Sequence, residues 1–141
     1  MLATICVLSV FVFCTVVAEL GSNGNFVHAG SVDGLGVGIY WDAGCTNRTV
    51  SFNWGPIEAG SNNTLIIYIR NEMNSEASLS LHTINYTPSN SSDYIFLNWN
   101  YSGQVLSADQ VIPIELTLTI LPNINGIDNF SFNTIISASG R

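Results

Sequence analysis

The sequence contains no lysine, and charged residues make up only 9% of its 141 residues. Its cations are Arg48, Arg70 and Arg141, which stand against ten acidic residues and leave a formal net charge of −7. Binding along a phosphate backbone requires many cationic side chains, so this composition excludes nucleic acid as a partner. The absence of lysine also excludes catalysis through a lysine amine.

Cysteine is scarce as well, with three residues in the chain. Cys6 and Cys14 lie in the apolar stretch at the N-terminus, which leaves Cys45 alone in the remainder. Cys45 therefore has no partner there for an internal disulfide, and immunoglobulin domains with the conserved cysteine pair are excluded. Cys45 is either a small buried thiol or a thiol that bridges two chains.

Motifs for catalysis and for cofactor binding are missing. The sequence has two histidines, and neither has a cysteine, histidine or carboxylate at a spacing typical of metal ligands. It has no nucleophile elbow and no metalloprotease motif. The glycine-rich run at 34–38 leads into a strand pattern and not into a helix, which favours close strand packing over phosphate binding. We therefore expect no enzymatic activity, no metal and no cofactor.

The first 18 residues contain a long apolar stretch. Residues 2–18 carry no charge, and Val16, Val17 and Ala18 fit a signal-peptidase cleavage site. Three interpretations stay open for residues 1–18: a cleaved signal peptide, a retained membrane anchor, or a helix packed in a filament core. All three predict that the rest of the chain is extracellular or at the cell surface. Residues 2–18 are the part that would contact a membrane.

Beyond a glycine-rich linker, apolar residues recur with the period of two that is typical of strands. We assign residues 19–34 to a linker that contains a possible donor strand, and residues 35–141 to one folded domain. Seven strands at this spacing indicate an all-β fold, a single antiparallel β-sandwich of the immunoglobulin-like or jelly-roll class. The expected strands are at 37–41, 52–54, 65–69, 79–82, 95–100, 112–120 and 130–137.

Two further patterns bear on the surface. The glycosylation triplet Asn-x-Ser/Thr occurs six times, either as true acceptor sites or as an accident of a composition rich in Asn, Ser and Thr. Trp41, Trp54 and Trp99 fall at the ends of expected strands, which favours core packing over a sugar-stacking platform. The candidate glycosylation sites are Asn47, Asn62, Asn85, Asn90, Asn100 and Asn129.

The long strands carry very little charge. Glu115 is the one ionisable residue at 112–120, and the last strand has none before Arg141. Soluble proteins commonly protect sheet edges with lysine or inward-pointing charge. We therefore expect the strands at 112–120 and 130–137 to offer open edges, to which a neighbouring subunit could add residues 25–32 as a donor strand.

Three segments carry a resemblance to known proteins. Residues 39–45 (Ile-Tyr-Trp-Asp-x-x-Cys), 52–60 and 67–72 resemble a small class of exported archaeal single-domain β-sandwich proteins. The chain also resembles immunoglobulin-like surface domains and, more loosely, TasA- and camelysin-like matrix or pilus subunits. The resemblance covers about residues 35–137, and it implies an extracellular location and assembly into fibres.

Together these observations predict a non-enzymatic, glycosylated structural protein outside the cell. The expected role is a subunit of a pilus or matrix fibre, assembled with copies of itself by strand exchange. The alternative is a membrane-anchored module for adhesion or glycan binding.

Overall fold

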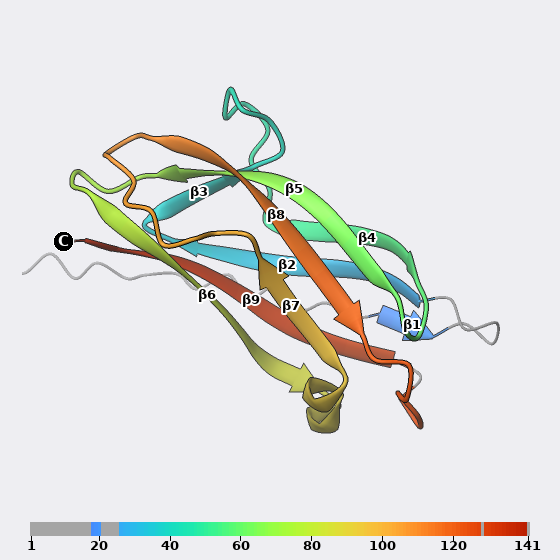
Figure 1. Cartoon of the computed structure of the whole chain (residues 1–141). Coiled ribbons are helices and arrows are strands. Elements are labelled where there is room, and N and C mark those ends of the chain that lie inside the picture. Colours follow the sequence, from blue (N-terminus) through green and yellow to red (C-terminus); the bar gives the residue numbers. More distant parts are fainter. Residues whose placement is uncertain (1–17, 21–25, 128, 141) are drawn as a thin grey trace, which may run out of the picture.

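The computed structural model describes residues 18–20, 26–127 and 129–140, with side chains from residue 34 on except at 53, 55, 56 and 129. These residues form nine strands and one short 3₁₀ helix, arranged as two sheets that pack face to face (Figure 1). The mostly-β, two-sheet architecture predicted from the alternating pattern is confirmed. The segment predicted to be a signal peptide or an anchor, residues 1–18, lies outside the described residues except for Ala18.

The larger sheet, sheet A, has five strands in the order β4-β2-β1-β9-β6. Its short strand β1 pairs with the start of both β2 and β9, and beyond β1 the strands β2 and β9 pair directly. The strands are β1 (Ala18–Leu20), β2 (Phe26–Leu35), β4 (Ser51–Ile57), β6 (Ala77–Thr87) and β9 (Asn129–Gly140).

The smaller sheet, sheet B, has four strands in the order β3-β5-β8-β7. All its neighbours are antiparallel, and the long central pair β5–β8 runs in register from Asn62 opposite Thr119 to Arg70 opposite Val111. The 3₁₀ helix η1 (Ser89–Asp93) joins sheet A to sheet B. The strands of sheet B are β3 (Val37–Tyr40), β5 (Asn62–Asn71), β7 (Ile95–Trp99) and β8 (Val111–Ile120).

The core lies between the sheets and follows from the alternation in the sequence. On β8 every second side chain is buried, and the residues between them face solvent or are half-buried. Phe130, Phe132 and Ile136 of β9 close the core from sheet A. A strand with one core face and one outer face has this period because successive side chains point to opposite sides. The inward residues of β8 are Ile112, Ile114, Leu116, Leu118 and Ile120.

Two sequence expectations about strand pairing are wrong. The strands at 112–120 and 130–137 are interior strands: β8 lies between β5 and β7, and β9 lies between β6 and the β1–β2 pair. The side of each strand that faces the core lacks charge because ionised side chains are costly there, and neither strand is an edge strand. The sandwich is also not wholly antiparallel, because Ser31–Leu35 of β2 run parallel to Asn133–Ser137 of β9.

The exposed stretch of β8 is protected in a different way. Strand β7 ends where Trp99 pairs with Leu116, so it does not extend along residues 111–115. There the Oδ1 atom of Asn100 accepts a hydrogen bond of 2.9 Å from the backbone N–H of Glu115. Pro113 has no N–H to offer a further strand. A proline and a side-chain cap therefore protect this edge without any charge.

Asn71, at the end of β5, is a fully buried junction. Its Nδ2 atom donates to the carbonyl oxygens of Ser75, Leu106 and Ser107 at 2.8, 3.1 and 3.1 Å, and its Oδ1 accepts from the N–H of Met73. One side chain thus joins β5, the turn to β6 and the irregular segment that leads into β8. Buried carbonyl groups without a donor are costly, so this amide stabilises three segments at once.

Replacing Asn71 should strongly destabilise the fold. Asn71→Asp keeps the shape but presents carboxylate oxygens to three carbonyl oxygens, and we expect the free energy of unfolding to fall by about 3 kcal/mol. Urea denaturation followed by circular dichroism measures this change. Asn125→Asp makes the same chemical change at an exposed loop position and should have little effect. An equal loss in both variants would contradict the role given to Asn71.

Candidate functional site

Strand β2, which follows β1 in the chain, joins two parts of sheet A. Its first half pairs antiparallel with β4, from Phe26 opposite Ile57 to Ser31 opposite Ser51, and its second half pairs parallel with β9. Strand β4 lies at the edge of the sheet, and β2 is its neighbour there (Figure 1). We call the position between β4 and β9 the β2 slot. The segment expected to be a linker or a donor strand, 19–34, fills this slot of its own chain over residues 26–34, and residues 21–25 lie outside the described ones.

A single residue, Gly36, connects β2, the strand in the slot, to β3. Strands β2 and β3 belong to different sheets and are separated only by Gly36, whose φ of +72° is in the region that favours glycine. A Cβ atom at Gly36 would lie 3.2 Å from the side chain of Met73. The carbonyl of Gly36 accepts a hydrogen bond from the backbone N–H of Glu72 at 3.0 Å. The corner is therefore short and tightly held.

Polar side chains gather beside this corner, around Tyr40 at the end of β3. The hydroxyl of Tyr40 donates to Glu72 Oε1 at 2.9 Å and accepts from Arg70 at 2.9 Å. Arg70 and Arg48 form ion pairs with the two oxygens of Glu72 at 3.0 and 3.1 Å. Both guanidinium groups also lie over the Tyr40 ring, 5.2 and 5.7 Å from its centroid, within the range of cation–π contacts. We call these four residues the Tyr40 cluster.

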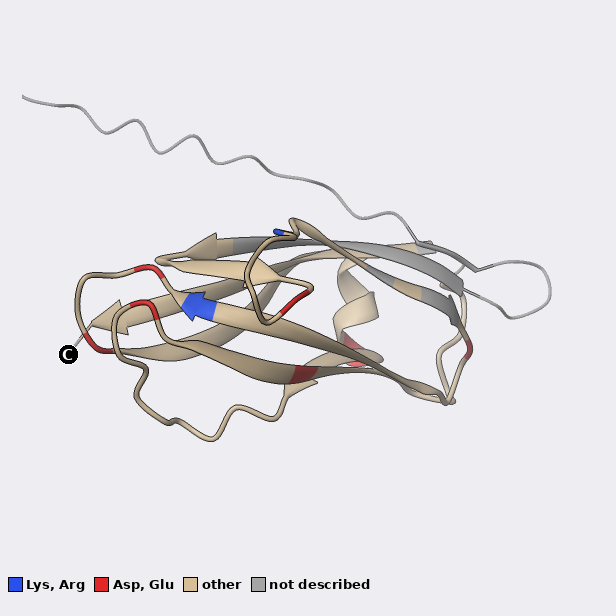
Figure 2. Cartoon of the chain, turned by 90° about the horizontal axis from the view of Figure 1, so that it is seen from above, with Lys and Arg blue, Asp and Glu red and all other residues tan. Residues whose placement is uncertain are grey.

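The Tyr40 cluster holds both of the cations in the described chain and carries one net positive charge. Figure 2 shows how sparse charge is elsewhere on the ribbon. Burial alone would raise the pKa of Glu72, but hydrogen bonds from Tyr40 and Arg70 and the charge of Arg48 outweigh it and hold that pKa below its usual value. The pKa of the Tyr40 hydroxyl is raised, first by burial and then by Glu72.

Gly38 explains why the cluster can lie flat on β3. A Cβ atom at Gly38 would come within 2.6 Å or less of Glu72 Oε1 and of two atoms of Tyr40, so any larger residue would displace the cluster. The glycine-rich run was expected to pack closely against a neighbour, and at Gly38 that neighbour is an ionic cluster. The sequence showed no sign of the cluster itself, because residues 40, 48, 70 and 72 come from a strand end, a loop and a second strand.

The loop after β3 is held by Asp42. Its carboxylate accepts hydrogen bonds from the backbone N–H groups of Thr46 and Asn47, and these lower its pKa. Cys45, the candidate for an intermolecular disulfide, is partly exposed in this loop and has a φ of +55°. Its accessibility is compatible with a bridge between chains, and that bridge stays a prediction.

Five of the six candidate glycosylation residues are exposed: Asn47, Asn62, Asn85, Asn90 and Asn100. Asn85 has a φ of +57° at an irregularity of β6, a conformation that asparagine tolerates better than most residues. The side chain of Asn129 lies outside the described ones. Attachment of sugar at these residues stays a prediction, and the exposed positions leave room for it.

The three tryptophans differ in exposure. Trp54 is 6% exposed and Trp41 is partly buried, and both pack edge-to-face on Phe52 with centroid distances of 6.1 and 5.9 Å. Trp99 is partly buried beside Tyr101, at a centroid distance of 5.1 Å. Trp54 is a core residue, while Trp41 and Trp99 each combine core packing with an exposed portion.

Within the described part of the chain, no group of three or more His, Cys, Asp or Glu side chains is arranged to hold a metal ion. No helix among the described residues is long and apolar enough to cross a membrane. Comparison with known proteins found no matching family model, no matching curated protein and no matching solved structure.

Acid should weaken the fold through the Tyr40 cluster. Because the pKa of Glu72 is lowered by folding, its contribution is present above its unfolded pKa and is lost as the pH falls through the folded value. The urea midpoint should therefore fall as the pH drops below the ordinary pKa of a glutamate, about 4.3. Glu72→Gln should lower the midpoint at neutral pH and flatten this dependence. Glu58→Gln, at an exposed acid in the turn after β4, serves as the control; an unchanged slope in Glu72→Gln would contradict the assignment.

Proposed function

We propose that this protein is a non-enzymatic structural subunit of an extracellular filament, in which β2 of one subunit fills the β2 slot of the next. The observation that carries the proposal is the position of β2. It is the second of the described strands, it links β4 to β9 together with the short strand β1 that precedes it, and a single residue joins it to the strands that follow. Exchanging β2 together with β1 between copies preserves every pairing of the sheet, which is the requirement for domain swapping.

The hydrogen-bonding capacity of the slot supports exchange. Without β2, the edges of β4 and β9 that face it would have unpaired N–H and C=O groups, which require another extended strand. The slot therefore needs a strand from its own chain or from a neighbour. Because β2 continues into β3 through Gly36, a change at this one corner would redirect the strand to a neighbouring subunit.

Surface features agree with a location outside the cell. Five exposed Asn-x-Ser/Thr sites suit a glycoprotein, and the apolar residues 2–18 suit export or anchoring. Within this proposal the two packed sheets form an immunoglobulin-like or jelly-roll sandwich that assembles with copies of itself.

Cross-linking across the β2–β4 pair tests the exchange. Ser31 and Ser51 are register partners, and antiparallel partners have Cβ atoms close enough for a disulfide. Two single variants, Ser31→Cys and Ser51→Cys, are prepared with Cys6, Cys14 and Cys45 all replaced by serine. After mixing, assembly and oxidation, we expect fibres in negative stain and an interchain disulfide between positions 31 and 51, identified by peptide mass spectrometry.

The double variant with both substitutions in one chain is the matched control. In a chain that keeps its own β2, the disulfide between positions 31 and 51 forms within that chain. The double variant therefore shows whether these two positions are close enough to be linked. A link in the double variant, with none between chains in the mixture and no fibres under any condition, would overturn strand exchange.

A second candidate function is an adhesion or glycan-binding module. The observation that favours it is the partial exposure of Trp41 and Trp99, since sugars stack on accessible aromatic rings. Trp99 also lies beside Tyr101, which enlarges the aromatic surface.

Tryptophan substitutions test this second candidate. If the protein binds polysaccharide through these rings, Trp41→Phe or Trp99→Phe should weaken binding in a pull-down with purified cell-wall polysaccharide by about tenfold. Trp54→Phe changes a buried ring and should alter stability without changing binding. Equal binding by all three variants, or no binding by the unmodified chain, would reject the candidate.

A further inference from the structure

The outer side of the β5–β8 pair is an apolar patch with one charge at each of two opposite corners. We define the β5–β8 face as Ile66, Tyr68 and Arg70 of β5 with Val111, Pro113 and Glu115 of β8. These residues form three rows in register: Arg70 with Val111, Tyr68 with Pro113, and Ile66 with Glu115.

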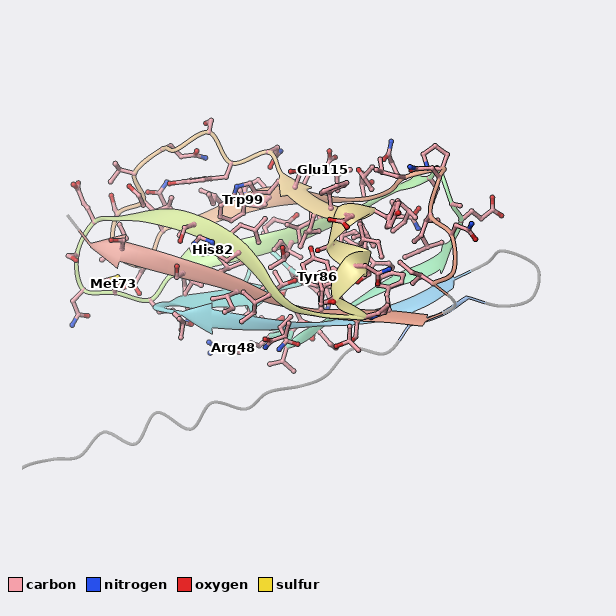
Figure 3. All side chains as sticks on the ribbon, turned by 90° about the horizontal axis from the view of Figure 1, so that it is seen from below. Arg48, Met73, His82, Tyr86, Trp99 and Glu115 are labelled. Carbon is pink, nitrogen blue, oxygen red and sulfur yellow. The ribbon has the colours of Figure 1, made fainter. Side chains whose placement is uncertain are left out.

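The face points away from the core. The intervening residues Ile67, Ile69, Ile112 and Ile114 are buried, so the alternate side chains of both strands lie on the solvent side. Ile66 is 57% exposed, more than any other described large apolar side chain within a strand. Pro113 and Glu115 are exposed, and Tyr68 and Val111 are half-buried. Figure 3 shows Glu115 on the side of the molecule formed by sheet B.

The arrangement of charges on this face is self-complementary. Arg70 belongs to the Tyr40 cluster, whose net charge is positive, and Glu115 lies at the diagonally opposite corner and makes no ion pair within the described structure. Consider a two-fold axis that lies parallel to the sheet, over the row formed by Tyr68 and Pro113, and perpendicular to the line from Arg70 to Glu115. Such an axis places Arg70 of each copy opposite Glu115 of the other. An interface of this kind is isologous, with the same contact made twice.

The spacing of a β-sheet allows this superposition. Arg70 and Glu115 are separated by four residues along the strands, about 13 Å, and by one strand, about 5 Å. When the axis places Arg70 of one copy over Glu115 of the other, the strands of the two copies cross at about 40°. Aligned sheets that pack face to face cross at roughly 30°, so the charge pairing and the usual sheet geometry agree.

Net charge and area also favour this face. In a chain of net charge −7, two copies repel one another, and the repulsion is weakest where the described cations lie. Strands β5 and β8 have ten residues each and β3 and β7 have four and five, which gives an outer face of about 450 Å² per copy, or about 900 Å² in a pair. That area is below the range of stable specific interfaces, which begins at about 1,200 Å², and fits a weak, transient dimer.

We propose that the β5–β8 face binds the same face of a second copy across a two-fold axis, with reciprocal contacts between Arg70 and Glu115. Tyr68 and Pro113 form the apolar centre of this interface, and Ile66 and Val111 occupy its two other corners. The contact is separate from exchange of β2, since it uses the outer side of sheet B and leaves every strand in its own chain. In a fibre it would join two strand-exchanged rows side by side.

Sedimentation velocity of the full chain, from about 1 to about 500 µM, tests the interface. We expect a reversible dimer that dissociates on dilution. Ile66→Asn removes an exposed apolar side chain without opening the core and should raise the dissociation constant at least about tenfold. Glu115→Arg, which brings two cations together at each corner, should have at least the same effect. Val50→Asn, at a loop residue that is 62% exposed and outside the face, is the matched control.

Circular dichroism verifies that each variant is folded before its association is interpreted. A chain that stays monomeric at about 500 µM, or a dimer that neither Ile66→Asn nor Glu115→Arg weakens, would overturn the proposal. The disulfide between positions 31 and 51 keeps the two proposals distinguishable. An interchain link that persists in Ile66→Asn supports exchange alone, and a dimer without that link supports the face contact alone.

Discussion

The corner at Gly36 determines how the chain is divided between its two sheets. On one side of it β2 completes sheet A, and on the other side β3 begins sheet B. A residue with a side chain would be strained at this φ and would press against Met73. The turn that carries Met73 is held in turn by the buried amide of Asn71, which binds three carbonyl groups of neighbouring segments. The position of β2 in sheet A and the conformation of the turn that carries Met73 therefore depend on one another.

The proposed strand exchange and the proposed face contact would use different physical properties of the same sandwich. Exchange would rest on backbone hydrogen bonding, which is the same for a strand from either chain and so would cost no specific contact. The face contact would rest on side chains, with an apolar centre between a cation and an anion at diagonally opposite corners. A protein with so little charge has few charged groups with which to select a partner, and in the proposed contact Arg70 and Glu115 would supply much of the specificity.

Much of the strand content followed from alternation in the sequence. The pattern at 112–120 predicted β8 with the correct inward residues, and Ile95, Leu97 and Trp99 marked β7 in the same way. The first strands were missed as parts of the domain, because residues 19–34 contain small and polar residues without a clear period of two. The Tyr40 cluster was missed too. Arg48 and Arg70 stood out only as two of three cations, and nothing in their spacing indicated that both would pair with Glu72.

The sequence by itself determined which segments are extended and which side of each is apolar, because the alternation of side chains across a strand is a local property of the backbone. It also determined the low charge of the surface and the absence of an internal disulfide beyond the first residues. Only the tertiary structure decided which strand lies beside which. It made β8 and β9 interior strands, turned part of β2 parallel to β9, and placed Arg70 diagonally across from Glu115. The reason is that backbone N–H and C=O groups are identical in every strand, so the choice of partner and register depends on how distant segments bury their apolar faces together.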